Sequence, residues 1–351
     1  MFNKNLKYYR LKKHMTKKDL ASKCGLSPIN ITYYEDGTRK PSMENLKLLA
    51  KALDVRVSDF LAVRNENLVF THGEFRKTSA LRKADQEFVR ESVEEYFSRF
   101  FSAVELLGGE VLPEPPECHT IVLSGDAEED SINLRRHLGL ASDGPIDDLI
   151  GILENKGILI FVCKIENDKF SGMNGFVNDR PYIVINGNMS TERNRSTIVH
   201  ELSHLMFMWP ENMEEKELEK YATAISGAFL FPKQDAIREL GIRRREISKD
   251  MEIVCKEYGI SMYLLVKRAQ LSAIISEEVE QNFYIRANQY GWRKREPSRI
   301  EAEKPFLFEQ LVYRAVNEQE ISVQRGAELL QMPYTKVVEQ CCFNGDNGWN
   351  I

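Results

Sequence analysis

Two histidines and a glutamate in the stretch "STIVHELSHLMF", residues 196–207, have the spacing of a metal site. On a helix His200 and His204 are four residues apart, so both imidazoles project from one face and can reach a single ion. Glu201 lies one position further round, where it can reach a water on that ion. A metal lowers the pKa of such a water, and a carboxylate can take its proton and pass it to a leaving amine. The pattern predicts metal-dependent peptide hydrolysis.

The alternative is a helix that carries two histidines by chance. A random H-E-x-x-H is expected in on the order of one chain in a hundred. The opposite face of this helix is apolar, through Ile198, Leu202 and Leu205, so the histidine face is not needed for the core. A chance placement of the two histidines is therefore the weaker interpretation.

A third ligand is expected from the segment "EEKELEKYATAISGAFLFP", residues 214–232, which has the pattern of a helix. Its candidate carboxylates are Glu214, Glu215, Glu217 and Glu219. Glu219 is favoured because it shares a face with Ala222 and Ser226, small residues that let two helices lie close together. Zn²⁺ suits two imidazoles and one carboxylate, and Mn²⁺ is possible.

The elements that must position these residues are short. We expect strands in "ILIFVCKI" (158–165), "GMNGFV" (172–177) and "PYIVIN" (181–186), which are rich in β-branched or aromatic residues. Ser190 or Thr191 is expected to cap the histidine helix, and Pro210 to end it. An earlier helix is expected to begin at Asp143 or Gly144, before Pro145, and to end at Gly157.

Residues 130–275 resemble the ImmA/IrrE family of metallopeptidases. The resemblance is carried by "LGLASDGPIDDLIGILENKGILI", "YIVINGNMSTERNRSTIVHELSHLMF", "EKYATAISGAFLFP" and "YGISMYLLVKRAQLSAII". It implies that His200, His204 and Glu219 are metal ligands and that Glu201 is the general base. Thr223 stands where the family usually has Asn or Asp, which puts a hydrogen bond to a ligand in question. Tyr221 is a weak candidate for the oxyanion donor and is more typical of a packing tyrosine.

The N-terminal 64 residues differ in charge from the rest. They contain 14 Lys and Arg and 6 Asp and Glu, a net +8, whereas the whole chain is −5, so the other 287 residues carry −13. A basic segment on an acidic body indicates a polyanionic partner. Five short helices are expected here, with Thr16, Ser27 and Ser42 as caps and Gly25 ending the second.

This N-terminal segment resembles the Xre family of helix-turn-helix DNA-binding domains, through "LASKCGLSPINITYYEDGTRKPSMENLKLLAKALDVRVSDFL". The resemblance implies a buried Arg10–Glu35 ion pair and a third helix that enters the major groove of double-stranded DNA. Pro28 stands where the family often has glutamine, so the operator sequence cannot be derived. The residues expected to contact DNA are Ile29, Asn30, Thr32 and Tyr33 at bases and Lys17, Lys18, Arg39 and Lys40 at phosphates.

The chain is thus expected to contain several domains, and its 29% charged and 42% hydrophobic residues are those of a globular protein. An all-α five-helix helix-turn-helix domain (1–64) is followed by a helical connector with a Pro-rich linker (65–125). An α+β zincin-like metallopeptidase domain (126–275) and a helical C-terminal region (276–351) complete the chain. No signal peptide or membrane span is evident, so we expect a cytoplasmic protein without a membrane partner. Six cysteines without a C-x-x-C pair argue against a disulfide framework.

These features predict a transcriptional regulator, acting as a homodimer on a palindromic operator. Its zinc-dependent peptidase domain would cleave a specific protein, either a repressor or antitoxin partner or its own chain. The family resemblance implies stress, mobile-element or toxin–antitoxin regulation. The alternative is a repressor or antitoxin that uses the metallopeptidase fold as a sensor or partner-binding surface, without turnover.

Overall fold

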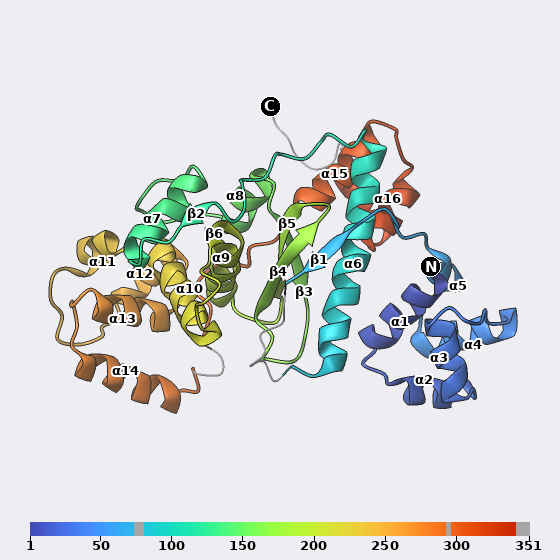
Figure 1. Ribbon diagram of the computed structural model, residues 1–351, viewed down its shortest axis with the longest axis horizontal. Coiled ribbons are helices and arrows are strands. Elements are labelled where there is room, and N and C mark those ends of the chain that lie inside the picture. Colours follow the sequence, from blue (N-terminus) through green and yellow to red (C-terminus); the bar gives the residue numbers. More distant parts are fainter. Residues whose placement is uncertain (74–80, 293–295, 342–351) are drawn as a thin grey trace. The chain divides into compact units, whose positions relative to one another are not determined.

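The computed structural model describes residues 1–73, 81–292 and 296–341. Contacts between residues divide this part of the chain into two compact units. The first contains residues 1–70, 81–111 and 308–341, and the second contains residues 71–73, 112–292 and 296–307. Figure 1 labels the elements of both. Among the described residues, no helix is long and apolar enough to cross a membrane.

Five helices form the N-terminal part of the first unit. They are α1 (Phe2–Lys12), α2 (Lys17–Cys24), α3 (Pro28–Glu35), α4 (Met43–Leu53) and α5 (Val57–Leu61). The expected caps are confirmed: the side chains of Thr16, Ser27 and Ser42 each accept a backbone N–H of the following helix, and Gly25 ends α2 in the left-handed conformation. Leu6, Leu20, Ile31, Leu49, Leu53 and Phe60 are completely buried and form the centre of this core.

The Arg10–Glu35 ion pair is also confirmed. Both side chains are buried, and the Arg10 Nη2 donates to Glu35 Oε2 over 2.9 Å. The pair joins α1 to the end of α3. It therefore fixes the third helix relative to the first.

The rest of the first unit is helical. Its elements are α6 (Lys83–Leu106), which packs on α1 and α16, and α15 (Leu307–Asn317), α16 (Val323–Leu330) and α17 (Tyr334–Cys341). Val89, Val93, Phe97 and Phe100 form the buried stripe of α6, as its helical spacing predicts. The Arg99 side chain donates to Glu95 on the same helix and to the carbonyl of Leu329, which ties α6 to α16.

A four-stranded sheet, in the order β1-β4-β5-β3, lies in the second unit. The strands are β1 (Phe70–His72), β3 (Leu159–Cys163), β4 (Gly172–Val177) and β5 (Arg180–Asn186). β3 runs parallel to β5, whereas β4 is antiparallel to it. The three strands expected from the sequence are confirmed, and β1 was not expected. Two further short strands, β2 (Ile121–Val122) and β6 (Phe207–Met208), pair in parallel.

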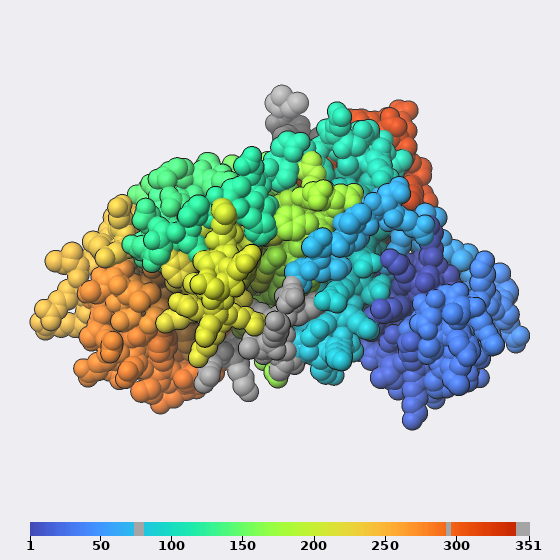
Figure 2. Space-filling view, viewed as in Figure 1, coloured from blue at the N-terminus to red at the C-terminus, as the bar shows by residue number. Residues whose placement is uncertain are grey.

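Helices cover this sheet and extend beyond it. They are α7 (Ala127–His137), α8 (Leu149–Asn155), α9 (Thr191–Met206), α10 (Glu215–Leu230), α11 (Lys233–Leu240), α12 (Met251–Tyr258), α13 (Met262–Leu271) and α14 (Glu277–Gln289). The chain is therefore mostly helical, with a helix-turn-helix domain followed by a mixed α/β region. Ile183 and Ile185 of β5 belong to the same buried core as Ile198 and Leu202 of α9. In Figure 2, α10 (yellow) lies at the surface beside α7 (green), with which it is in contact.

The predicted start of α8 was wrong. The helix begins after Asp148, whose side chain accepts the N–H of Gly151, rather than at Asp143 or Gly144. Gly144 instead donates its N–H to Asp235 and accepts Arg135 at its carbonyl, so distant partners hold that segment outside a helix. Cys24, Cys118 and Cys255 are free thiols, and Cys342 lies outside the described residues.

Candidate metal centre

Helix α9 presents His200 and His204 on one face. Ser190 caps the helix by accepting the N–H of Arg193, and Ile198 and Leu202 are buried on the opposite side. The two imidazole Nε2 atoms are 3.0 Å apart. The spacing of four residues thus brings both imidazoles to one face of the helix, as the sequence predicts, with their Nε2 atoms close together.

Helix α10 supplies the third group. Its small residues allow close packing on α9: Ala222 is completely buried, and the Ser226 hydroxyl donates to the carbonyl of Ser196 over 2.8 Å. The Glu219 carboxylate oxygens then lie 3.3 Å from His200 Nε2 and 3.4 Å from His204 Nε2. The structure therefore brings together the three predicted ligand residues, whose ligand atoms all lie within 4.8 Å of one another.

These separations fit a divalent cation. Ligand atoms at about 2.0–2.1 Å from a tetrahedral zinc are roughly 3.3 Å apart, close to the 3.0, 3.3 and 3.4 Å observed. Three protein ligands leave a fourth position for water or substrate, as in catalytic sites. The donor set of two imidazoles and a carboxylate suits zinc and other divalent metals of similar preference.

Thr223 determines which nitrogen of His200 is available. Its hydroxyl donates to the carbonyl of Glu219 over 2.8 Å, so its single proton is already used. The contact of 3.3 Å between Thr223 Oγ1 and His200 Nδ1 therefore requires that Nδ1–H be the donor. Nε2 is then unprotonated and directed at the other two ligand groups. Thr223 thus orients a candidate ligand, as the hydrogen-bond partners of metal-binding histidines generally do.

Glu201 is buried beside the cluster and is held by a residue that the sequence analysis did not identify. Asn174 Nδ2, from β4, donates to Glu201 Oε2 over 2.8 Å. The approach of α9 to β4 is close because residue 172 is glycine: a Cβ there would lie 2.5 Å from Thr197 Cγ2. No local pattern marks Asn174, since it contacts Glu201 only through the packing of β4 on α9.

Tyr221 is not directed at the ligand cluster. Its hydroxyl donates to Asp130 Oδ2 over 2.7 Å. Burial, together with this hydrogen bond, raises the pKa of Tyr221 above its ordinary value. The hydroxyl proton is thus committed to Asp130, which agrees with the packing role rather than with an oxyanion donor.

A cleft of about 1460 Å³ lies next to Thr223, and none of His200, His204 and Glu219 is among its lining residues. Thr223 and Ser196 line it from α10 and α9, and Lys220 and Arg193 add positive charge. Further side chains come from the loop before α9 and from α13. This volume exceeds the roughly 300–1,000 Å³ of ordinary small-molecule sites.

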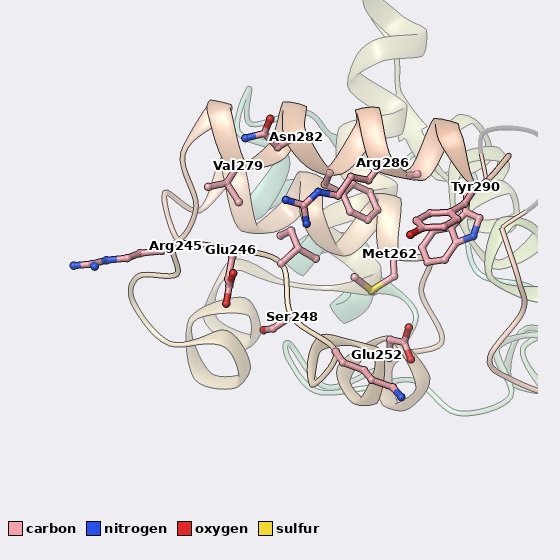
Figure 3. A pocket seen from close by; sticks show the side chains of 14 residues that line it. Arg245, Glu246, Ser248, Glu252, Met262, Val279, Asn282, Arg286 and Tyr290 are labelled. Carbon is pink, nitrogen blue, oxygen red and sulfur yellow. The ribbon is translucent and has the colours of Figure 1, made fainter.

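A second groove, of about 250 Å³, lies between α14 and the loop before α12. Figure 3 shows Arg286 projecting from α14 toward a floor that includes Met262. None of its lining residues belongs to the His200, His204 and Glu219 cluster. Trp292 lines both this groove and the larger cleft, so the two hollows adjoin one another.

The residues predicted to contact DNA lie on α2, on α3 and in the turn after α3. Ile29 is 60% exposed and Tyr33 is 36% exposed, whereas the neighbouring Tyr34 is buried. The Arg39 guanidinium lies 4.7 Å from the Tyr33 ring centroid. The other predicted contacts are exposed (Lys18, Lys40) or half-buried (Asn30, Thr32, Lys17).

Two of these residues have partners inside the domain. Lys17 Nζ lies 3.7 Å from Glu35 Oε2, and the Thr32 hydroxyl donates to the carbonyl of Pro28. Lys18, Arg39 and Lys40 have no such ion pair among the described residues. They are the stronger candidates for phosphate contacts.

Comparisons with known proteins match both the N-terminal helical segment and the segment that carries the candidate metal cluster. Residues 6–60 match the helix-turn-helix family and residues 153–270 match the IrrE N-terminal-like domain of the M78 peptidases. A curated protein of Bacillus subtilis (strain 168), the uncharacterized HTH-type transcriptional regulator YqaE, is 34% identical over 70 residues, which are 20% of this chain and 60% of that protein. No solved structure matches the chain. The chain therefore carries an Xre-type helix-turn-helix domain and an IrrE N-terminal-like peptidase domain.

Proposed function

We propose that this protein is a cytoplasmic transcriptional regulator whose zincin-like domain hydrolyses a peptide bond in a specific protein. The observation that carries the proposal is the convergence of His200, His204 and Glu219, with the Glu201 carboxylate beside them. Binding of the helix-turn-helix domain to DNA would restrict the reaction to few target proteins. We expect these to be a repressor or antitoxin-type partner, or the chain itself, in stress, mobile-element or toxin–antitoxin regulation.

The metal-binding residues would be His200, His204 and Glu219, with zinc as the expected ion. When bound, such an ion supplies Lewis acidity, which polarises a peptide carbonyl and makes water a better nucleophile. Glu201 accepts a proton from the attacking water and returns it to the leaving amine nitrogen. Asn174 holds that carboxylate in place, and Thr223 keeps His200 in the tautomer that presents Nε2.

The helix-turn-helix domain is proposed to bind a double-stranded DNA operator as a homodimer, with half-sites about one helical turn apart. Asn30 would read a base edge, and Lys18, Arg39 and Lys40 would contact phosphates. Substitution of Lys40 by Ala should weaken binding to all DNA sequences and reduce the salt dependence by about one counterion. Substitution of Asn30 by Ala should instead reduce discrimination between operator and random DNA.

The second candidate is a regulator that senses a ligand or partner without turnover. The groove beside Arg286 favours it, because charged side chains there (Arg286, Glu252) surround an apolar floor that includes Met262, a lining suited to a small ligand. The two candidates differ in whether Glu201 is needed.

The test is the Glu201→Gln variant of the full chain. It should keep its metal, lose all hydrolysis and retain a bound partner that the unaltered protein would cleave. The partner is identified by pull-down, beside metal analysis of both proteins. Persistence of derepression in the Glu201→Gln strain would show that hydrolysis is not the mechanism.

A further inference from the structure

Residues 71–73, which follow the helix-turn-helix domain in the chain, lie along β4. This is the strand whose Asn174 side chain donates a hydrogen bond to Glu201. Thr71 and His72 of β1 occupy the outer edge of β4, and β1 ends the sheet on that side. Gly73 N donates to the carbonyl of Asn174 over 2.8 Å. The same Asn174 donates its side-chain amide to Glu201. One residue thus connects this segment to the general base.

The fit between the segment and β4 is close. A Cβ at residue 73 would lie 2.6 Å from the carbonyl oxygen of Asn174 and 3.0 Å from its Oδ1, so only glycine fits at this position. Thr71 approaches Gly175 in the same way, since a Cβ at residue 175 would lie 2.6 Å from the Thr71 carbonyl oxygen. The two glycines allow the backbones to lie against each other.

A side-chain contact also holds the segment. His72 Nδ1 lies 2.6 Å from the hydroxyl of Tyr182, a completely buried residue of β5. Tyr182 is paired with Gly175 on β4. The absence of a side chain at Gly175 lets the tyrosine hydroxyl reach across β4 to His72. The segment is therefore fixed both by its backbone and by a hydrogen bond from two strands away.

An exposed strand edge is a template for an extended peptide, which adds to the sheet through main-chain hydrogen bonds. The β4 edge adjoins Asn174 and Glu201, where an extended substrate would need to lie. We propose that residues 71–73 are an internal strap that fills the peptide-binding edge of β4, so that a substrate segment must displace the strap to reach the metal centre. This inference rests on the proposed peptidase function, and it makes the chain between the two domains a regulator of access.

The test measures binding of a fluorescein-labelled peptide with the sequence of residues 66–73 ("ENLVFTHG") to the full chain, by anisotropy. All proteins carry Glu201→Gln, so that cleavage plays no part. Two substitutions weaken the strap. Both are made in the chain and not in the peptide: Gly73→Pro removes the N–H that the Asn174 carbonyl accepts, and His72→Phe removes the ring nitrogen that contacts the Tyr182 hydroxyl. His137→Phe is the matched control, because His137 is also hydrogen-bonded, to the carbonyl of Glu117, but lies on α7.

The tethered strap competes with the free peptide at high effective concentration. We therefore expect the peptide to bind about tenfold more tightly to the Gly73→Pro or His72→Phe protein than to the parent or the His137→Phe control. His72→Phe leaves the backbone N–H groups in place, so it provides the answer if Gly73→Pro does not fold. Equal affinity for the parent and for every folded variant would overturn the strap.

This result is independent of hydrolysis. If the peptide binds the weakened proteins more tightly but the corresponding proteins with Glu201 intact cleave nothing, the strap stands and the proposed peptidase function fails. If cleavage occurs but peptide binding is the same in all variants, the peptidase function stands and the strap is wrong.

Discussion

Asn174 Nδ2 donates a hydrogen bond of 2.8 Å to Glu201 Oε2, which joins β4 to the carboxylate next to the candidate metal ligands. A carboxylate that must accept and release a proton needs a fixed position as well as a suitable neighbour. Asn174 provides that position from a different element. In the proposed reaction, the distance between β4 and α9 is therefore part of the catalytic geometry.

Replacement of Asn174 by Ala should leave metal content unchanged and lower kcat. The Glu201 carboxylate would lose the donor that orients it, and loss of such an outer partner typically costs about 10- to 100-fold. The measurement is the rate of cleavage of the partner captured with Glu201→Gln, together with metal analysis. Asn282→Ala, in the distant groove, is the control and should retain full activity. Unchanged kcat in Asn174→Ala would remove this residue from the mechanism.

Replacement of Glu219 by Gln should abolish tight metal binding. The two imidazoles would remain, but a neutral amide is a much poorer ligand than a carboxylate for a divalent cation. Glu217→Gln is a matched control, since Glu217 is on the same helix and exposed. Metal analysis after dialysis should find about one ion per chain in the parent and the control, and little in Glu219→Gln. Equal metal content in the two variants would exclude Glu219 as a ligand.

Replacement of Thr223 by Val keeps the shape of the side chain but removes the oxygen that accepts from His200 Nδ1–H. A partly buried donor would lose its partner, and the tautomer that presents Nε2 would no longer be favoured. We expect metal affinity to fall about 10- to 100-fold, as measured by competition with a chelator. Thr223→Ser retains the hydroxyl and should bind metal nearly as the parent does. A similar loss in both variants would point to packing rather than to the hydrogen bond.

The features that the sequence predicted depend on residues near one another in the chain. The caps at Ser27, Ser42 and Ser190 each satisfy a backbone N–H three residues on, so the local sequence specifies them. His200 and His204 are aligned by the period of a single helix. The prediction of Glu219 required one further inference, that small residues on its helix allow close packing against the histidine helix.

The features that the sequence missed depend on contacts between distant segments. Asn174 is ordinary within its strand and becomes important only because β4 packs on α9. β1 is short and pairs with a strand that comes much later in the chain, so no local pattern marks it. The start of α8 was misplaced because Asp235 and Arg135 hold Gly144 in a loop. Local propensity cannot anticipate such partners.

Glu154 gives a prediction about stability and pH. Its carboxylate is buried and accepts the backbone N–H groups of Phe306 and Leu307 over 2.9 and 3.1 Å. Burial raises the pKa of Glu154 to about 7, from 4.5, and outweighs the two hydrogen bonds, which lower it. Between these two values the folded protein binds the proton more tightly than the unfolded chain does. Protonation of Glu154 therefore stabilises the folded protein. This contribution is complete below pH 4.5 and is lost as the pH rises through 7.

Substitution of Glu154 by Gln, which resembles the protonated acid, should remove this dependence. The free energy of unfolding of the parent, relative to that of the variant, should fall by about 2 to 3 kcal/mol between pH 5 and pH 8. Urea unfolding at the two pH values measures it, with the exposed Glu246→Gln as a control that should follow the parent at both. If the parent and Glu154→Gln differ by the same amount at pH 5 and pH 8, the carboxyl group does not titrate in this range. The two backbone amides would then dominate over burial, and the pKa of Glu154 would lie near that of an ordinary glutamate.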